Sequence, residues 1–192
     1  HAGSSARARE ARPAWLFARG GPRLVVTRRV RTGSQPKSVS VSPDGRQVWV
    51  AAFGTRDANN VDVFDAHTLA LWGRVSFQGN AVETIFTPDG RTAYVSNFVR
   101  GTVEEIDVAT RTVRASIVGG LDPKVLALSS DARRLYIVNW RSNDVYVVDT
   151  ATRERLQRLR TGRHPRGFAV LRDGRVLVAS TETNTVYAFD AN

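Results

Sequence analysis

The stretch Ser42-Pro-Asp-Gly-Arg46 decides the fold of this chain, because close copies of it recur at a nearly fixed spacing. Its aspartate, Asp44, has counterparts at successive intervals of 45, 42 and 42 residues, namely Asp89, Asp131 and Asp173. A second aspartate recurs at intervals of 42, 42 and 41 residues, at Asp65, Asp107, Asp149 and Asp190. Two independent markers that keep one period indicate an array of four structural repeats.

Each repeat reads as four short β-strands. In the first repeat, residues 37–42 and 47–53 flank the Pro-Asp-Gly turn, in which Pro presets φ and Gly supplies the positive φ of a hairpin. Residues 61–65 alternate like a third strand, and an Asp-x-x-Thr turn leads to a fourth strand over residues 69–77. Four antiparallel strands in about 42 residues are typical of one β-propeller blade.

The sequence therefore predicts an all-β protein, a β-propeller of about four four-stranded blades. We expect residues 1–22 to form a basic N-terminal extension and residues 23–192 to form the propeller. The predicted blade repeats are 33–77, 78–118, 119–160, and 161–192 together with 24–31.

The N-terminal strand is predicted to complete the last blade. Residues 24–33 align with residues 154–162, since both segments end in Arg-Thr-Gly, and the last repeat stops before its own fourth strand. Residues 24–31 would then pair with the third strand of the last blade and hide a sheet edge. A two-chain ring of eight blades and a longer chain are the alternatives.

Two second-strand sequences, Tyr94-Val-Ser-Asn97 and Tyr136-Ile-Val-Asn139, resemble the YVTN-type bacterial β-propeller repeat. The Ser-Pro-Asp-Gly-Arg turn is similar to that family as well. The segments Trp49–Ala52 and Leu177–Ser180 depart from it, because they lack the final Asn. The resemblance implies an extracytoplasmic, periplasmic or cell-surface propeller with a binding or structural role and no shared catalytic motif.

Composition excludes several classes of function. The 192 residues contain no cysteine, which removes a disulfide framework, a thiol nucleophile and a cysteine metal site.

The formal charge is +10, and arginines concentrate in residues 1–32 and 153–175. Binding of a polyanion through these segments is one alternative, with steep salt dependence. Nucleic acid is not the expected partner, because regular aromatic interleaving is missing.

Both lysines of the chain occupy the same repeat position. Lys37 and Lys124 follow a proline at the start of a first strand, and Arg166 holds that position in the fourth repeat. We expect these three cations to surround one mouth of the central channel and to capture a carboxylate or phosphate. The alternative is a framework role, in which they pair with neighbours such as Asp122 or Glu83.

Other candidate ligand-binding residues belong to loops at the same end of the strands. Phe98 and Trp140 follow second strands, as Phe53 does, and could stack on a ligand or pack between blades. His164 is the one histidine of this loop set, and Asn80 and Asp122 precede first strands. No matched acid–base pair accompanies His164, so no catalytic residue is predicted.

The expected function is a non-enzymatic binding or scaffold protein of the cell envelope that uses its loop-rich face for a protein partner or a small anionic ligand. A propeller enzyme of the lyase or lactonase type, with its site at the channel mouth, is the first alternative, and polyanion binding is the second. No cofactor and no metal site are expected, since the three histidines are dispersed. Membrane contact through residues around Trp15 is a weaker expectation.

Overall fold

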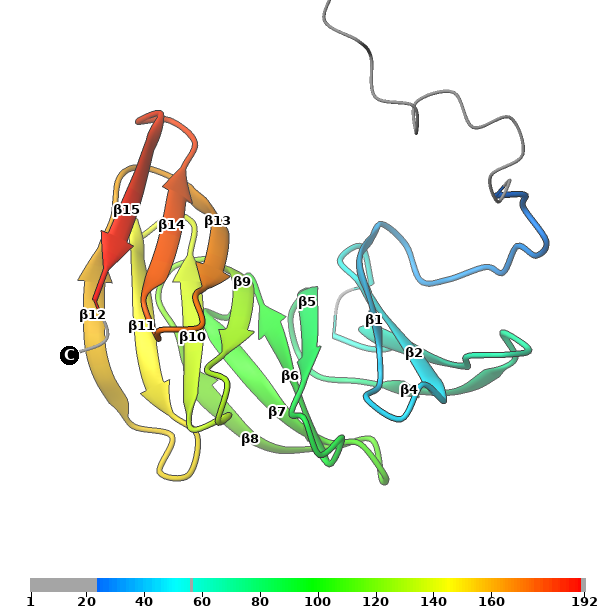
Figure 1. Cartoon of the computed structure of the whole chain (residues 1–192). Helices are drawn as coiled ribbons and strands as arrows, with labels where there is room; N and C mark the ends of the chain where they lie inside the picture. The colour runs from blue at the N-terminus through cyan, green and yellow to red at the C-terminus, as the bar shows by residue number, and fades with distance from the viewer. Residues whose placement is uncertain (1–23, 56, 191–192) are drawn as a thin grey trace, which may run out of the picture. The chain divides into compact units, whose positions relative to one another are not determined.

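The computed structural model describes residues 24–55 and 57–190 (Figure 1). The chain divides into two units, residues 1–30 and 31–192, and every strand belongs to the second unit. The described residues contain no helix, and hence none long and apolar enough to cross a membrane. The fold is all-β, as the repeats predict.

The strands form four antiparallel sheets, in which each strand pairs with the next along the chain. The first sheet contains β1 (Pro36–Val41), β2 (Gln47–Ala52), β3 (Val61–Asp65) and β4 (Leu71–Val75). The second contains β5 (Ala81–Phe86), β6 (Thr92–Asn97), β7 (Thr102–Asp107) and β8 (Thr112–Val118). The third contains β9 (Pro123–Leu128), β10 (Arg134–Asn139), β11 (Asp144–Asp149) and β12 (Arg155–Arg160). The fourth contains β13 (Pro165–Val170), β14 (Val176–Ser180) and β15 (Thr185–Phe189).

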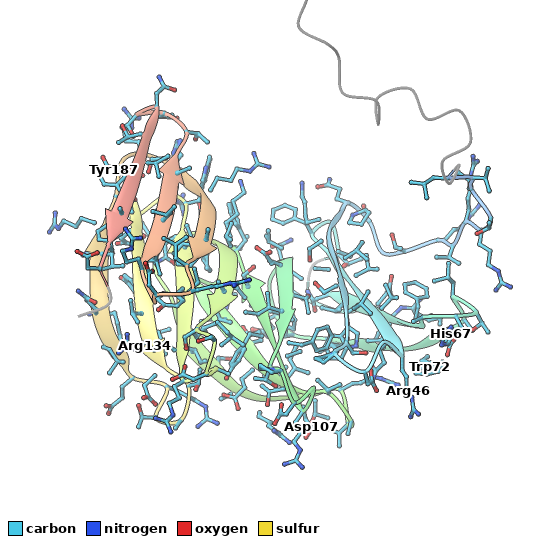
Figure 2. The ribbon with its side chains drawn as sticks, in the orientation of Figure 1. Arg46, His67, Trp72, Asp107, Arg134 and Tyr187 are labelled. Atoms are coloured by element: carbon cyan, nitrogen blue, oxygen red, sulfur yellow. The ribbon has the colours of Figure 1, made fainter. Side chains whose placement is uncertain are left out.

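The repeated aspartates close the hairpins at one end of the strands, which we call the turn end. Asp44 Oδ1 accepts hydrogen bonds from Ser42 Oγ at 2.6 Å and from the backbone N–H of Arg46 at 3.1 Å. These bonds favour the ionised carboxylate and lower the pKa of Asp44. The third turn lacks Gly, and Ala132 adopts the required left-handed conformation with φ of 56°. Arg46 and Asp107 are labelled at this end in Figure 2.

The final Asn of the second strand fastens the loop at the opposite end. Asn97 Oδ1 accepts a hydrogen bond from the N–H of Asn80, and Asn139 Oδ1 accepts one from the N–H of Gly120. Each amide therefore holds the loop that enters the first strand of its own sheet. Because Asn satisfies buried backbone groups here, the motif residue serves the framework of the blade.

Apolar clusters join successive sheets. Trp49 and Val61 of the first sheet pack with Val95 of the second, and all three are 0% exposed. Comparable clusters join the second sheet to the third and the third to the fourth. The innermost strands β1, β5, β9 and β13 contact one another in that order. The core thus lies between sheets, as in stacked repeats.

The structure does not show the predicted completion of the last blade by residues 24–31. These residues form no strand, and in the described part of the chain the fourth sheet has only β13, β14 and β15. Packing links each sheet to the next one along the chain, so β15 lies three sheets beyond the sheet that contains β1. The predicted extension over residues 1–22 lies outside the described residues.

Candidate functional site

A β-bulge begins the innermost strand of each sheet, and it determines where the cations point. In β1, Pro36 and Ser38 pair with consecutive residues of β2, so Lys37 is left without a partner in the register. Lys124 and Arg166 are skipped in the same way at the starts of β9 and β13. Bulges change the direction of a side chain relative to the sheet. The three cations therefore share one backbone environment.

These cations meet at a cavity of about 340 Å³, here called the cation pocket. Lys37, Lys124 and Arg166 line it from three different sheets, together with Phe53 and Phe98. The remaining lining residues are Ser38, Val82, Glu83 and Val125. Residues far apart in the sequence thus converge at one site, where the repeat positions predict that they should lie.

The cations of the pocket form no salt bridge in the described part of the chain, although the charge of Asp122 acts on Lys124. Among residues 24–55 and 57–190, no carboxylate forms a salt bridge with Lys37, Lys124 or Arg166. Burial lowers the pKa of Lys124, the positive charges of Arg166 and Lys37 lower it further, and the charge of Asp122 partly opposes this lowering. A multiply charged anion placed between these groups would relieve that repulsion.

Among the described residues, Glu83 is the one acidic group that lines the cation pocket, and its sequence position suggests only a possible partner for a cation. Its Oε2 accepts a hydrogen bond of 3.3 Å from the backbone N–H of Leu126. Burial raises the pKa of Glu83 to about 7, despite that hydrogen bond. Near neutral pH, this group is therefore present both as the charged carboxylate, which accepts hydrogen bonds, and as the neutral acid, which can donate one. The buried Oγ of Ser38, also in the lining, has no hydrogen-bond partner among the described residues.

A row of contacting aromatic rings lies beside the pocket, and three of them belong to residues that directly follow second strands in the sequence. Phe53 contacts Phe98 edge to face at 5.6 Å between centroids, and Phe98 lies 6.3 Å from Trp140. The ring of His164 stacks on Trp140 at 4.1 Å with an interplanar angle of 16°. Lys37 Nζ lies 5.3 Å from the ring centre of Phe53, and Lys124 Nζ lies 4.6 Å from that of Trp140, which are cation–π distances. The rings fix the lysine side chains near the pocket.

Four of the predicted ligand residues do not line the cavity: Asn80, Asp122, Trp140 and His164. Asn80 Nδ2 donates to the carbonyl of Phe53 at 2.6 Å, which ties the second sheet's loop to the first. Asp122 is paired with Arg141 through two contacts of 3.1 Å. Both groups are therefore engaged in holding loops rather than free for a ligand.

His164 has a similar framework environment. Its Nδ1 lies 2.5 Å from Glu182 Oε1, and its backbone N–H donates to Asn143 Oδ1. His164 and Asp122 both adopt left-handed φ values, 53° and 57°, at the same repeat position. Non-glycine residues with short polar side chains are favoured there. This backbone requirement explains their residue types without reference to a ligand.

The turn end offers no comparable site. The repeated aspartates from Asp44 to Asp173 are hydrogen-bonded within their own turns, as Asp65 is to Thr68 Oγ1 at 2.7 Å. Within residues 24–55 and 57–190, no three His, Cys, Asp or Glu side chains gather in a way that could hold a metal ion.

Comparison with solved structures identifies the architecture. This is a β-propeller fold. The chain is similar to hydrazine synthase of Kuenenia stuttgartiensis, with a TM-score of 0.73 and 22% identity over 87% of this chain and 49% of that one. A putative 6-phosphogluconolactonase of Bacteroides fragilis gives a TM-score of 0.71 and 23% identity over 82% and 51%. A functionally unknown protein of Desulfotomaculum acetoxidans gives 0.67 and 18% over 82% and 52%.

These similarities extend to the fold alone. The chain spans about half the length of the propeller structures it matches. No protein-family model matches it, and neither does any curated protein. Assignment to the YVTN-type repeat family therefore stays a prediction based on the second-strand motifs.

Proposed function

We propose that the protein binds a small, multiply charged anion, such as a di- or tricarboxylate or a phosphate ester, in the cation pocket. One observation carries the proposal: Lys37, Lys124 and Arg166 line one cavity and have no carboxylate partner among the described residues. Elsewhere in this part of the chain, the buried carboxylates Asp62, Glu105 and Asp144 are each paired with an arginine. Converging unmatched cations in a concave site are typical of anion recognition.

The pocket also favours a ligand with a flat or apolar portion. Phe53 and Phe98 form part of its wall, and Val82 and Val125 complete the apolar lining. An anion whose carbon skeleton rests on these side chains would gain apolar contact while its charged groups meet the cations. Glu83, with its pKa raised to about 7, adds a group that can donate a hydrogen bond to the ligand when protonated.

Isothermal titration calorimetry with citrate and with inorganic phosphate tests the proposal. We expect saturable binding to the chain and at least about tenfold weaker binding after Lys124→Ala, since loss of one charge-assisted hydrogen bond costs about 1.5–3 kcal/mol. The triple variant Lys37→Ala, Lys124→Ala and Arg166→Ala should show no saturable binding. A tight complex with the triple variant would contradict the proposal.

A matched control removes the same charge from the other end of the strands. Arg46, Arg91 and Arg133 are exposed and occupy one repeat position at the turn end. Their replacement by alanine lowers the net charge as much as the triple pocket variant does. We expect this control to retain the wild-type affinity, apart from the small change due to long-range electrostatics. Equal weakening by both triple variants would indicate general charge attraction instead of a pocket.

A catalytic role is the second candidate, and Glu83 is the observation that favours it. A carboxyl with its pKa raised to about 7 is suited to general acid–base work at neutral pH. Two of the similar structures are named as putative 6-phosphogluconolactonases, and a phosphorylated sugar lactone is a small anion of the proposed kind. Hydrolysis of such a lactone that is lost in Glu83→Gln, with anion binding retained, would support this role.

A further inference from the structure

The first sheet presents a side that is covered in the other repeats. In β1, Val39 and Val41 are 67% and 56% exposed. The residues at the Val39 position in the second and third repeats are Thr84 and Leu126, which are 1% and 4% exposed. The preceding sheet packs over those two residues. In the fourth repeat the equivalent residue, Phe168, is partly buried and packs against the cluster shared with the third sheet. Val39 therefore lies at a position that the preceding sheet covers, fully or partly, in the other three repeats.

The fourth sheet shows the same contrast on its opposite side. Val186 in β15 is 64% exposed, whereas its counterparts Val61, Val103 and Val145 are all 0% exposed. In those three repeats, the following sheet covers the valine. Ala169 of β13 lies on the same open face of the fourth sheet and is also exposed.

These two open faces match because each is one half of a junction that the chain already builds between its sheets. At the first junction, Ser40 Oγ donates to the carbonyl of Thr84 at 2.5 Å, and Val61 packs with Val95 in one apolar cluster. The open face of the fourth sheet carries the corresponding positions Ala169 and Val186, and that of the first sheet carries Val39. Val50, the counterpart of Val95 in the first sheet, is only 5% exposed.

The edge of the fourth sheet is also unfilled. Within the described residues, β15 pairs only with β14, whereas the third strand of every other sheet has a fourth strand beside it. An unpaired edge strand favours the addition of another strand. Residues 24–31 align with β12, a fourth strand, and Leu24 and Val26 among them are 97% and 73% exposed.

We propose that a second copy of this chain docks head to tail, so that the fourth sheet of each copy packs on the first sheet of the other. Residues 24–31 of one copy would then add to β15 of the other and fill the position beside β15 that no described strand occupies. Two such junctions close a ring of eight sheets, within the range of closed propellers. A head-to-tail interface gives a ring when its rotation closes.

A second copy fits these faces better than an unrelated partner because one chain contains both halves of the junction. The similar solved structures support continuation of the fold, since this chain covers only 49–52% of their lengths. The cation pockets of both copies would then surround a single channel mouth. The inference is independent of the proposed anion binding, because no pocket residue belongs to either open face.

Sedimentation equilibrium of the full 192-residue chain tests the pairing. We expect twice the mass of one chain, and the mass of one chain for Val39→Asp and for Val186→Asp. Val118→Asp is the matched control, because Val118 is 75% exposed in β8, away from both faces, and should leave the pair intact. A wild-type mass of one chain, or of an open-ended series of oligomers, would overturn the proposal.

Cysteine cross-linking provides a measurement that does not depend on a destabilised variant. The chain has no cysteine, so introduced thiols are the only ones present. By the repeat correspondence with Ser40 and Thr84, Ala169→Cys in one copy should lie beside Val39→Cys in the other. The double variant should oxidise to a disulfide-linked pair of chains, whereas Ala169→Cys with Val118→Cys should not. Failure of the first pair to cross-link, in a chain that still unfolds cooperatively, would count against the head-to-tail arrangement.

Discussion

The third strands and the cation pocket both contain charged side chains, but only the third strands supply partners for theirs. Asp62, Glu105 and Asp144 have side chains that are 2%, 8% and 0% exposed, and each pairs with an arginine from an outer strand or a turn. Lys37, Lys124 and Arg166 have no such partner among the described residues. The difference separates charges that hold the propeller together from charges that are available to a ligand.

The largest expected effect on stability is at Asp144. Its carboxylate accepts hydrogen bonds from Asn139 Nδ2, Ser142 Oγ and Arg158 Nε, at 2.9, 2.8 and 2.7 Å. Asp144→Ala leaves these donors unpaired, so we expect the free energy of unfolding to fall by about 3–5 kcal/mol, as for broken buried ion pairs. Urea denaturation measures this change. Asp173→Ala, at an exposed pair with Arg175, is the control and should cost far less.

The next prediction concerns Glu83, whose burial opposes its charge. Because the pKa of Glu83 is raised to about 7 in the folded protein, its ionisation is more costly there than in the unfolded chain. Wild-type stability should therefore fall as the pH rises from about 4.5 through about 7. Glu83→Gln should remove this loss, so that the variant gains stability relative to wild type with rising pH. Thermal unfolding at pH 5, 6, 7 and 8 compares the two proteins. An identical pH profile for both would contradict the assigned environment of Glu83.

For the aspartates of the turn end, we expect the opposite dependence of folding stability on pH. Hydrogen bonds within the turns lower the pKa values of seven repeated aspartates, from Asp44 to Asp173, below their usual range. A lowered pKa in the folded state gives stability that is present above about pH 4 and is lost as the pH falls below it. Unfolding measured between pH 5 and pH 2 should show this loss in wild type. Replacing Asp44, Asp89 and Asp131 together by Asn should make the loss smaller.

The smallest expected effect on stability is at the pocket cations. Lys124 is partly buried among like charges and forms no ion pair in the described part of the chain, so Lys124→Ala removes repulsion as well as packing. We expect the free energy of unfolding to change by no more than about 0.5 kcal/mol. A large loss of stability, measured by urea denaturation, would place Lys124 in the framework instead.

The repeats predict most of the fold because turn chemistry and strand alternation are local. Val61–Asp65 is a strand in both the prediction and the structure, and the Asp turns have their expected hydrogen bonds. The pairing predicted for residues 24–31 could not be established from sequence, since it depends on which sheets are neighbours in space. The alignment with residues 154–162 reveals the strand pattern but not the edge that receives it.

The sequence predicts the three cations of the candidate site but not its buried carboxyl group, Glu83. One repeat position brings Lys37, Lys124 and Arg166 together, because repeated strands begin at the same end. Glu83 lies in a two-residue bulge with Val82, where Ala81 and Thr84 keep the pairing. That irregularity, and the burial it produces, has no clear sequence signal. Asp122 and His164 looked like ligands from sequence because left-handed loop positions also favour such residues.

A crystal structure of the chain grown with citrate tests the central claim most directly. We predict the anion within hydrogen-bond distance of Lys37, Lys124 and Arg166, with Phe53 and Phe98 against its carbon atoms. Citrate bound only at the exposed arginines of the turn end, with an empty cation pocket at saturating concentration, would contradict the account.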